Sequence, residues 1–286
     1  MHPDLLKILG SNCRRTHLKP WVKRFRAYTR AAQDRQPIAY LLETADGRRF
    51  KLLFAPAGNR HLAKLKSTLP FARDLAFFPR CVFEDESHLL FEYVEGVLPD
   101  FSTAAFARGL AQGYAAVHAL QLESRDVEEY LIKVRRGVDK LGKAMSVDLS
   151  GVLAHIERHA PAKIHYSLDY CDIKPGNFIE NDAGVHFIDF GALKAEQAAG
   201  AMLFASPAFQ QVDKAVFFDA YEAAGGPAPL RAIHPFLRLA HLIMLAAFNE
   251  KKRKKVVWWD VMLRRRRRRR RDQLTQQLLR EFATLS

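Results

Sequence analysis

The chain has 286 residues, of which 49% are hydrophobic and 27% are charged, so it can bury a sizeable core and is not expected to be disordered or of low complexity. Its three cysteines, Cys13, Cys81 and Cys171, lie far apart without paired ligand spacing, which argues against a disulfide framework or a zinc site and fits a reducing compartment. Lysine and arginine number 45 against 31 aspartate and glutamate residues, and the net charge of +14 favours a polyanionic partner or an anionic surface.

The first part of the chain alternates strand-like runs with one helical stretch. Runs rich in β-branched, aromatic and leucine residues predict strands over 21–30, 37–44, 48–54, 77–83 and 88–94. Asp46-Gly47, between the second and third runs, predicts a tight hairpin. Apolar residues at helical spacing predict a helix over 59–69 with Asn59 as its N-cap. The predicted order is therefore three strands, one helix and two strands.

The rest of the chain is expected to be mainly helical. Helical spacing, an N-cap signal and a high alanine content predict a helix over 103–120, and a second helical region follows over about 127–145. Short strands are expected among polar loops at 164–165, 178–180 and 185–188. From residue 207 onward, helices dominate the predicted pattern.

The densest chemical signal lies in two short motifs on either side of the strands expected at 178–180 and 185–188. The first is Asp172-Ile-Lys174-Pro-Gly-Asn177, and the second is Asp189-Phe-Gly191. Phosphoryl transfer from a nucleotide needs a carboxylate that accepts the acceptor's proton, oxygen ligands for Mg²⁺ and positive charge. A loop and a neighbouring hairpin strand can bring these side chains to one metal-phosphate centre. Because Asp, Asn and Gly are also common turn residues, the alternative is an ordinary loop and hairpin.

These motifs resemble the catalytic and metal-binding segments of the kinase-like superfamily. The resemblance implies that Asp172 is the catalytic base or orients the acceptor hydroxyl, and that Lys174 contacts the γ-phosphate. It also implies that Asn177 is a Mg²⁺ ligand and that Asp189 is the main Mg²⁺ ligand. ATP and Mg²⁺ are therefore the expected cofactors.

Upstream segments carry a weaker form of the same resemblance. The run Phe-Glu-Tyr-Val-Glu-Gly at 91–96 resembles the hinge of aminoglycoside and choline phosphotransferase-like enzymes, which implies that the backbone of Glu92, Tyr93 and Val94 contacts the adenine. Lys51 is the lysine expected to contact the α- and β-phosphates, unless it is a solvated strand residue. Two further segments look like helices of this family. They contain His118, which is expected to serve packing or capping, and Tyr221, for which an ordinary helix end is the alternative.

The resemblance implies an α+β, two-lobed protein-kinase-like fold. The N-lobe, residues 1–95, would be a small antiparallel sheet with one helix that binds the nucleotide, and the hinge would lie near 92–96. The mainly helical C-lobe, residues 96–286, would hold the catalytic loop 172–177, the metal-binding segment 189–191 and the basic segment 251–271.

Three departures from the family pattern affect the expected site. Tyr170 stands two residues before Asp172, where the family usually has a histidine that braces the loop. The turn at 31–36 has no glycine, so phosphate contacts there would come from side chains such as Arg35. No glutamate lies between Glu43 and Glu84 to pair with the candidate phosphate lysine from the helix.

The basic segment is the most unusual part of the sequence. Residues 251–286 hold 14 basic and 3 acidic residues, or +11 of the net charge, and eight arginines run from Arg264 to Arg271. Eight consecutive arginines would cover every face of a helix, so we expect this run not to pack against a core but to be hydrated or bound to anions. Together with Trp258 and Trp259, the segment Lys251–Arg271 could bind an anionic membrane, a lipopolysaccharide or other acidic glycolipid, or nucleic acid. An ordinary charged surface is the alternative. Leucines after the run predict a final amphipathic helix that packs back on the protein.

We expect an ATP- and Mg²⁺-dependent kinase that acts on a hydroxyl of a small molecule or glycoconjugate, preferably a lipopolysaccharide-core or other envelope sugar. Only 95 residues follow Gly191, which is short for the substrate platform of a protein kinase. The alternatives are a pseudokinase scaffold that docks on membrane or nucleic acid, and a Ser/Thr protein kinase.

The expected location is cytoplasmic, with contact at the inner face of the cytoplasmic membrane. Residues 1–13 do not resemble a signal peptide. The apolar stretch 236–248 is shorter than the roughly 20 residues that span a bilayer, so a buried helix is predicted there.

Overall fold

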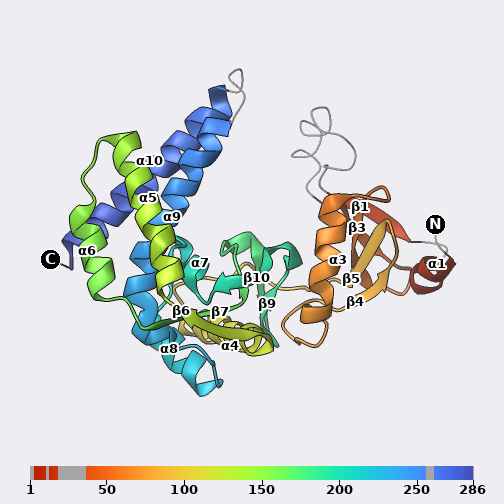
Figure 1. The fold of residues 1–286 in the computed structure, drawn as a ribbon. Helices are drawn as coiled ribbons and strands as arrows, with labels where there is room; N and C mark the ends of the chain where they lie inside the picture. The colour runs from red at the N-terminus through yellow and green to blue at the C-terminus, as the bar shows by residue number, and fades with distance from the viewer. Residues whose placement is uncertain (1–2, 11–12, 19–36, 256–260, 286) are drawn as a thin grey trace. The chain divides into compact units, whose positions relative to one another are not determined.

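The computed structural model describes residues 3–10, 13–18, 37–255 and 261–285, and these form two compact units (Figure 1). Unit 1 comprises the chain up to Asp100 together with Lys174–Lys194, and unit 2 comprises Phe101–Ile173 and the chain from Ala195 onward. The segment that carries Asn177 and Asp189 therefore belongs to the unit of the N-terminal sheet and not to the bulk of the chain after residue 96. Asp172 and the basic segment belong to unit 2.

Unit 1 is built on a five-stranded antiparallel sheet with the order β1-β2-β3-β5-β4. Its strands are β1 (Arg14–Leu18), β2 (Ile38–Glu43), β3 (Arg49–Phe54), β4 (Cys81–Glu84) and β5 (His88–Glu92). The predicted strands over 37–44, 48–54 and 88–94 are confirmed, and the one predicted over 77–83 is a shorter strand that begins at Cys81. The strand predicted over 21–30 lies outside the described residues. Strand β1, a polar edge strand, was not predicted from the sequence.

Local sequence explains how the sheet and its helix form. Gly47 has a φ of +82° in the turn between β2 and β3, a conformation that favours glycine, and the predicted hairpin is present. The helix α3 (Arg60–Ala72) begins as predicted after Asn59, whose side chain accepts a hydrogen bond of 2.9 Å from the Leu62 amide. Leucines and aromatic residues of β2, β3 and β5 pack with the short helix α1 (Pro3–Leu9) in one hydrophobic core.

A two-stranded hairpin completes unit 1. Strands β8 (Phe178–Asn181) and β9 (Gly184–Phe187) pair in antiparallel register, as the sequence predicts. The segment after β5 meets this hairpin through paired backbone hydrogen bonds of 2.9 Å between Val97 and Glu180. Gly96 permits this approach, because a Cβ there would lie 2.3 Å from the Glu180 carbonyl oxygen and its φ is +150°. The hairpin is thus fixed to the segment that follows β5.

Unit 2 is mainly helical and contains a three-stranded sheet with the order β10-β7-β6. The strands are β6 (Leu122–Asp126), β7 (Lys163–Tyr170) and β10 (Leu193–Ala198), of which β10 begins at the boundary with unit 1. The described α-helices are α4 (Ala104–Leu120), α5 (Glu128–Met145), α6 (Ser150–Arg158), α7 (Ala201–Phe204), α8 (Lys214–Ala223), α9 (Leu230–Lys255) and α10 (Val261–Ala283). The helices predicted over 103–120 and 127–145 are confirmed as α4 and α5.

The long helix α9 is the centre of the second unit's packing. Within it, Leu230–Arg253 is long and apolar enough to cross a membrane by length and composition, but 61% of its most apolar window is buried inside the protein, as in the core helix of a soluble protein. Leu237, Leu242 and Ile243 are fully buried. The buried helix predicted over 236–248 is therefore present.

The arginine run corrects one expectation, because it does pack against the protein. It forms the first half of α10, which lies beside α9 (Figure 1). Arg271 is only 5% exposed, and its guanidinium donates a hydrogen bond of 2.9 Å to Glu250 of α9. One turn earlier, Arg267 donates a bond of 3.1 Å to Asn249. An unpaired arginine would be costly to bury, but Arg271 has a buried carboxylate as its partner on the neighbouring helix. The ion pair therefore allows this part of the run to pack against the protein.

The rest of α10 follows the predicted amphipathic pattern. Leu274 and Leu278 are buried against the protein, one and two turns beyond Arg271. Trp258 and Trp259, which the sequence analysis linked to a membrane surface, lie outside the described residues.

Candidate active site

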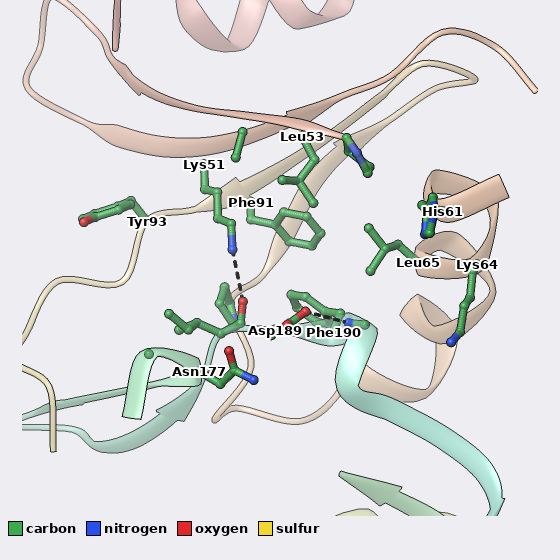
Figure 2. A pocket seen from close by; sticks show the side chains of 16 residues that line it. Lys51, Leu53, His61, Lys64, Leu65, Phe91, Tyr93, Asn177, Asp189 and Phe190 are labelled. Carbon is green, nitrogen blue, oxygen red and sulfur yellow. Dashed lines mark hydrogen bonds between the residues drawn. The ribbon is translucent and has the colours of Figure 1, made fainter. Parts of the chain in front are cut away.

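A pocket of about 640 Å³ opens within unit 1 (Figure 2). One side is the sheet, the second is α3, and the third is the segment that runs from the loop before β8 to the residues after β9. The described lining residues are Pro37, Ala39, Lys51, Leu53, His61, Lys64, Leu65, Pro79, Phe91, Tyr93, Gly176, Asn177, Ile188, Asp189, Phe190 and Gly191. Four residues named from the sequence, Lys51, Tyr93, Asn177 and Asp189, therefore meet at one pocket.

Lys51 projects from β3, the central strand of the sheet, into this pocket. Its ammonium group donates a hydrogen bond of 3.1 Å to the carbonyl of Ile188, the residue before Asp189. The bond fixes the lysine beside the candidate metal-binding carboxylate without the help of a glutamate from α3. The alternative of a fully solvated strand lysine is not what the structure shows.

Asn177 ends a short 3-10 turn, Pro175–Asn177, and is 4% exposed. Its amide donates to the Lys174 carbonyl at 3.0 Å, and its own carbonyl accepts a bond of 2.9 Å from the Ile188 amide. The second bond ties the loop to the end of β9. As a result, the Asn177 side chain lies on the same side of the pocket as Asp189, across from Lys51 (Figure 2).

Asp189 caps a second 3-10 turn, Phe190–Ala192, by accepting a hydrogen bond of 3.0 Å from the Gly191 amide. Gly191 packs closely against this carboxylate, because a Cβ there would lie 3.2 Å from both the Asp189 carboxylate and the Leu65 side chain. The Phe190 ring stacks on Phe91 of β5, with 4.7 Å between ring centroids. The phenylalanine thus anchors the segment on the sheet, and the glycine leaves the carboxylate in place.

Helix α3 brings a histidine and a lysine that were not predicted from the sequence as site residues. His61 and Lys64 lie one turn apart and line the pocket together with Leu65 (Figure 2). In the expected family pattern a glutamate on this helix would face the lysine of β3, and here the helix presents positive charge instead. The spacing of 61, 64 and 65 on one helical face was visible in the sequence, but it does not reveal which face turns to the sheet.

The candidate hinge residues divide into two groups. Tyr93 lines the pocket, whereas the Glu92 carboxylate forms an exposed ion pair with Arg80 at 2.5 Å. The amides of Glu92 and Tyr93 donate to the carbonyls of Arg80 and Arg49 in the sheet. Neither Glu92 nor Val94 is among the described lining residues.

Asp172 and Lys174 flank the boundary between the two units. Asp172 is half-buried and closely follows β7 in unit 2, whereas Lys174 is exposed and begins the segment assigned to unit 1. Neither is among the described residues that line the pocket. Arg35 and the glycine-free turn at 31–36 lie outside the described residues.

A buried polar network supports the end of β7, where Tyr170 replaces the expected histidine. The Tyr114 hydroxyl of α4 donates to the Tyr170 carbonyl, and both tyrosine side chains are fully buried. His118 contacts the Asp169 carboxylate at 3.3 Å and the Tyr221 hydroxyl at 2.8 Å. Burial raises the pKa of Tyr114 well above its usual value, so its hydroxyl remains a donor. The segments that contain His118 and Tyr221, which resemble family helices in the sequence, therefore meet near Asp169, three residues before Asp172.

Several solved proteins have an architecture similar to that of this chain. The macrolide 2'-phosphotransferase MphH from Brachybacterium faecium has a TM-score of 0.62 at 15% identity, over 92% of this chain and 94% of that one. A choline kinase from Cryptosporidium parvum Iowa II has a TM-score of 0.59 at 8% identity, over 99% and 92%. The aminoglycoside phosphotransferase APH(2'')-Ib, solved with ADP bound, has a TM-score of 0.55 at 13% identity, over 95% and 94%.

The chain has a kinase-like fold. At the level of sequence, no protein-family model and no curated protein matches it. The fold predicted from the Asp172–Gly191 motifs is confirmed, and identities this low establish the fold alone.

Proposed function

We propose that this protein is a phosphotransferase that uses ATP and Mg²⁺ and acts on an alcohol group of a small molecule or glycoconjugate. The observation that carries the proposal is the convergence of Lys51, Asn177 and Asp189 on one pocket of a kinase-like fold. Solved proteins of similar fold include macrolide, choline and aminoglycoside phosphotransferases, one of them with ADP bound. Unit 1 would then be the nucleotide-binding lobe, with its hinge near residues 92–96.

The donor set of the pocket fits Mg²⁺. This ion prefers oxygen ligands and is commonly held by one or two carboxylates together with substrate phosphates and water. Asp189 supplies a carboxylate and the nearly buried Asn177 an amide oxygen. The described residues hold no group of three or more His, Cys, Asp or Glu side chains placed to bind a metal, which suits a site completed by a nucleotide. When bound, Mg²⁺ would offset negative charge on the phosphates.

The cationic side chains of the pocket would hold the phosphates in place of a glycine-rich loop. Lys51 is fixed beside Asp189 by its bond to the Ile188 carbonyl, and Lys64 lines the same cavity from α3, where the His61 imidazole lies one turn away. Asp189 is the only acidic residue among the described lining residues, against the two lysines Lys51 and Lys64, so the net charge of the wall is positive. A polyphosphate is the kind of ligand that such a lining favours.

Asp172 would accept the proton of the acceptor hydroxyl, and Lys174 would offset charge on the transferred phosphoryl group. The bond from Tyr114 to the Tyr170 carbonyl supports the strand end that leads to Asp172. The Tyr170 side chain is buried, so we do not expect it to support the loop as the family's histidine side chain would. That support would come instead from Tyr114 of α4.

For the acceptor, we favour a lipopolysaccharide-core or other envelope sugar over a cationic antibiotic. The protein carries a net charge of +14, which would repel a polycationic aminoglycoside. The basic segment Lys251–Arg271 could attract a phosphorylated glycolipid, and such an enzyme would work at the inner face of the cytoplasmic membrane.

Nucleotide binding gives the first test. We expect ATP with Mg²⁺ to raise the melting temperature of the full chain, and Asp189→Ala to abolish the part of that shift that needs Mg²⁺. A wild-type protein that gives no shift with any nucleotide would instead support a pseudokinase scaffold.

Transfer from radiolabelled ATP identifies the acceptor. Label in a lipopolysaccharide or envelope-sugar fraction that disappears with Asp172→Ala would support the favoured acceptor. Label on the protein itself would point to the Ser/Thr kinase alternative. Label in the sugar fraction that persists with Asp172→Ala would contradict the proposed role of this chain.

A further inference from the structure

We propose that the outward face of the α9–α10 helix pair, at the end where α9 finishes and α10 begins, docks on an anionic phospholipid bilayer. The face comprises the exposed side chains of Lys251, Lys252, Met262, Arg265, Arg266, Arg268, Arg269 and Arg270. We call it the arginine face. Docking would depend on this face alone and not on phosphoryl transfer.

The arginine run divides into an inward and an outward set. Arg267 and Arg271, four residues apart, bond to Asn249 and Glu250 of α9. Each residue of a helix is turned by about 100° from the one before, so the exposed arginines between 265 and 270 fan over an arc of about 200°. The inward pair fixes the helix, and the outward set is presented to solvent as a broad surface.

Little negative charge opposes the outward set. Glu250 is fully buried and already engaged by Arg253 and Arg271. Asp272 pairs with Arg271 and lies 3.9 Å from Arg268. Within the described part of the chain, Arg265, Arg266, Arg269 and Arg270 form no ion pair. The arginine face therefore keeps most of its positive charge for an external partner.

Exposed apolar side chains accompany this charge. Met262 is 83% exposed and Leu263 is 37% exposed at the start of α10. On α9, Phe248 is 49% exposed, and the Lys252 ammonium lies 5.3 Å from its ring centroid. Because α9 and α10 pack side by side and only residues 256–260 separate them, these groups lie at the same end of the pair (Figure 1).

The order of the apolar and cationic side chains along the axis of α10 suits a bilayer. At a rise of 1.5 Å per residue, the arginines from 265 to 270 lie about 5–12 Å behind Met262 along the helix. The headgroup layer on each side of the hydrocarbon core is about 5–8 Å thick. If the methionine enters the edge of the hydrocarbon, the guanidinium groups reach the level of the lipid phosphates, which they bind well.

A nucleic acid fits this surface less well. Phosphodiester backbones attract arginines, but they offer nothing to an exposed methionine at the end of a helix pair. A bilayer uses both the apolar tip and the cationic belt behind it, so the structure favours an anionic phospholipid surface as the occupant.

Vesicle flotation of the full chain tests the proposal. We expect binding to vesicles of phosphatidylglycerol and phosphatidylcholine, little binding to phosphatidylcholine alone, and weaker binding as salt rises. The double variant Arg265→Gln/Arg269→Gln should weaken binding about thirtyfold, since each basic residue at an anionic surface is worth about 1 kcal/mol and 1.4 kcal/mol is tenfold. The matched control Arg108→Gln/Arg136→Gln removes the same charge from exposed positions on α4 and α5 and should leave binding unchanged.

Met262→Ser separates the bilayer from nucleic acid. It should weaken vesicle binding by about tenfold, since it removes an apolar group worth about 1.5–3 kcal/mol when fully buried, whereas Ile132→Ser on exposed α5 surface should not. Circular dichroism checks that each variant is folded. Equal binding to both vesicle types, equal losses from the arginine pair and its control, or duplex DNA binding with vesicle binding unaffected by Met262→Ser would each overturn the proposal.

Discussion

The pocket of unit 1 and the α9–α10 pair of unit 2 both gather positive charge, but they place it differently. In the pocket, Lys51 and Lys64 face a cavity that also holds one acidic side chain, Asp189. In the helix pair, a fully buried carboxylate, Glu250, holds Arg253 and Arg271, and Arg267 bonds to Asn249. The exposed arginines of the run lie between 265 and 270. Cations that line a cavity remain available to a small polyphosphate, whereas cations spread over a helix can only act on an extended surface.

The largest expected effect is on the chemistry attributed to the catalytic loop. Asp172→Asn should lower the rate of phosphoryl transfer by about 10²–10⁴-fold, because the acceptor hydroxyl loses its proton acceptor. Binding of ATP should stay near the wild-type value, since this residue is not among those that line the proposed nucleotide pocket. Single-turnover transfer and a nucleotide titration on the same preparation measure both quantities. Equal loss of binding and transfer would assign the residue to nucleotide binding instead.

The second effect tests whether the arginine run has separate inward and outward sets. Arg271→Gln leaves a buried carboxylate with one partner fewer and should lower the free energy of unfolding by about 3 kcal/mol. The matched variant Arg269→Gln, two residues earlier on the exposed face, should leave the urea midpoint unchanged. If both variants destabilise the protein equally, the inward and outward sets are not distinct.

The third effect is a pH dependence carried by the same carboxylate. Hydrogen bonds from Arg253, opposed by burial and aided by Arg271, lower the pKa of Glu250 from 4.5 to about 2. Between these two values the unfolded chain binds more protons than the folded one, so the stabilisation is complete above about pH 4.5 and is lost as the pH falls toward 2. The difference in unfolding free energy between wild type and Glu250→Gln should therefore shrink steadily over that range. A difference that is constant with pH would contradict the lowered pKa.

The smallest expected effect concerns the phosphate contact that we propose for Lys64 of α3. Lys64→Ala should weaken ATP binding by about tenfold and leave adenosine binding unchanged, because a charge-assisted hydrogen bond to a phosphate contributes about 1.5–3 kcal/mol and this side chain is exposed. Arg60→Ala, on the same helix and outside the described pocket lining, is the control and should change neither affinity. Calorimetry with ATP and with adenosine decides the matter, and parallel losses for the two ligands would remove Lys64 from the phosphate site.

Local patterns made the centre of the candidate site predictable. The turn residues and apolar alternation around 178–188 predicted the hairpin β8–β9, and the spacing of Asn177 and Asp189 follows from its length. His61 and Lys64 were missed because helical spacing shows which residues share a face but not which face turns toward the sheet. That choice depends on contacts such as the one between Thr68 and the Phe190 carbonyl, 122 residues apart.

Elements that depend on distant partners were also missed. Strands β6 and β10 have polar sequences, Leu-Glu-Ser-Arg-Asp and Leu-Lys-Ala-Glu-Gln-Ala, and are strands because they pair with the buried β7. The inward placement of Arg271 depends on Glu250, which is 21 residues away on another helix. In each case the sequence shows the side chain but not its partner.

The close approach of Gly96 to the Glu180 carbonyl limits how this protein could be engineered. Any larger residue at position 96 would push the backbone away from the hairpin that presents Asn177 and Asp189, so altering the link would also disturb the placement of these two side chains. Libraries that vary the wall of the pocket should therefore change Tyr93 and keep the glycine constant.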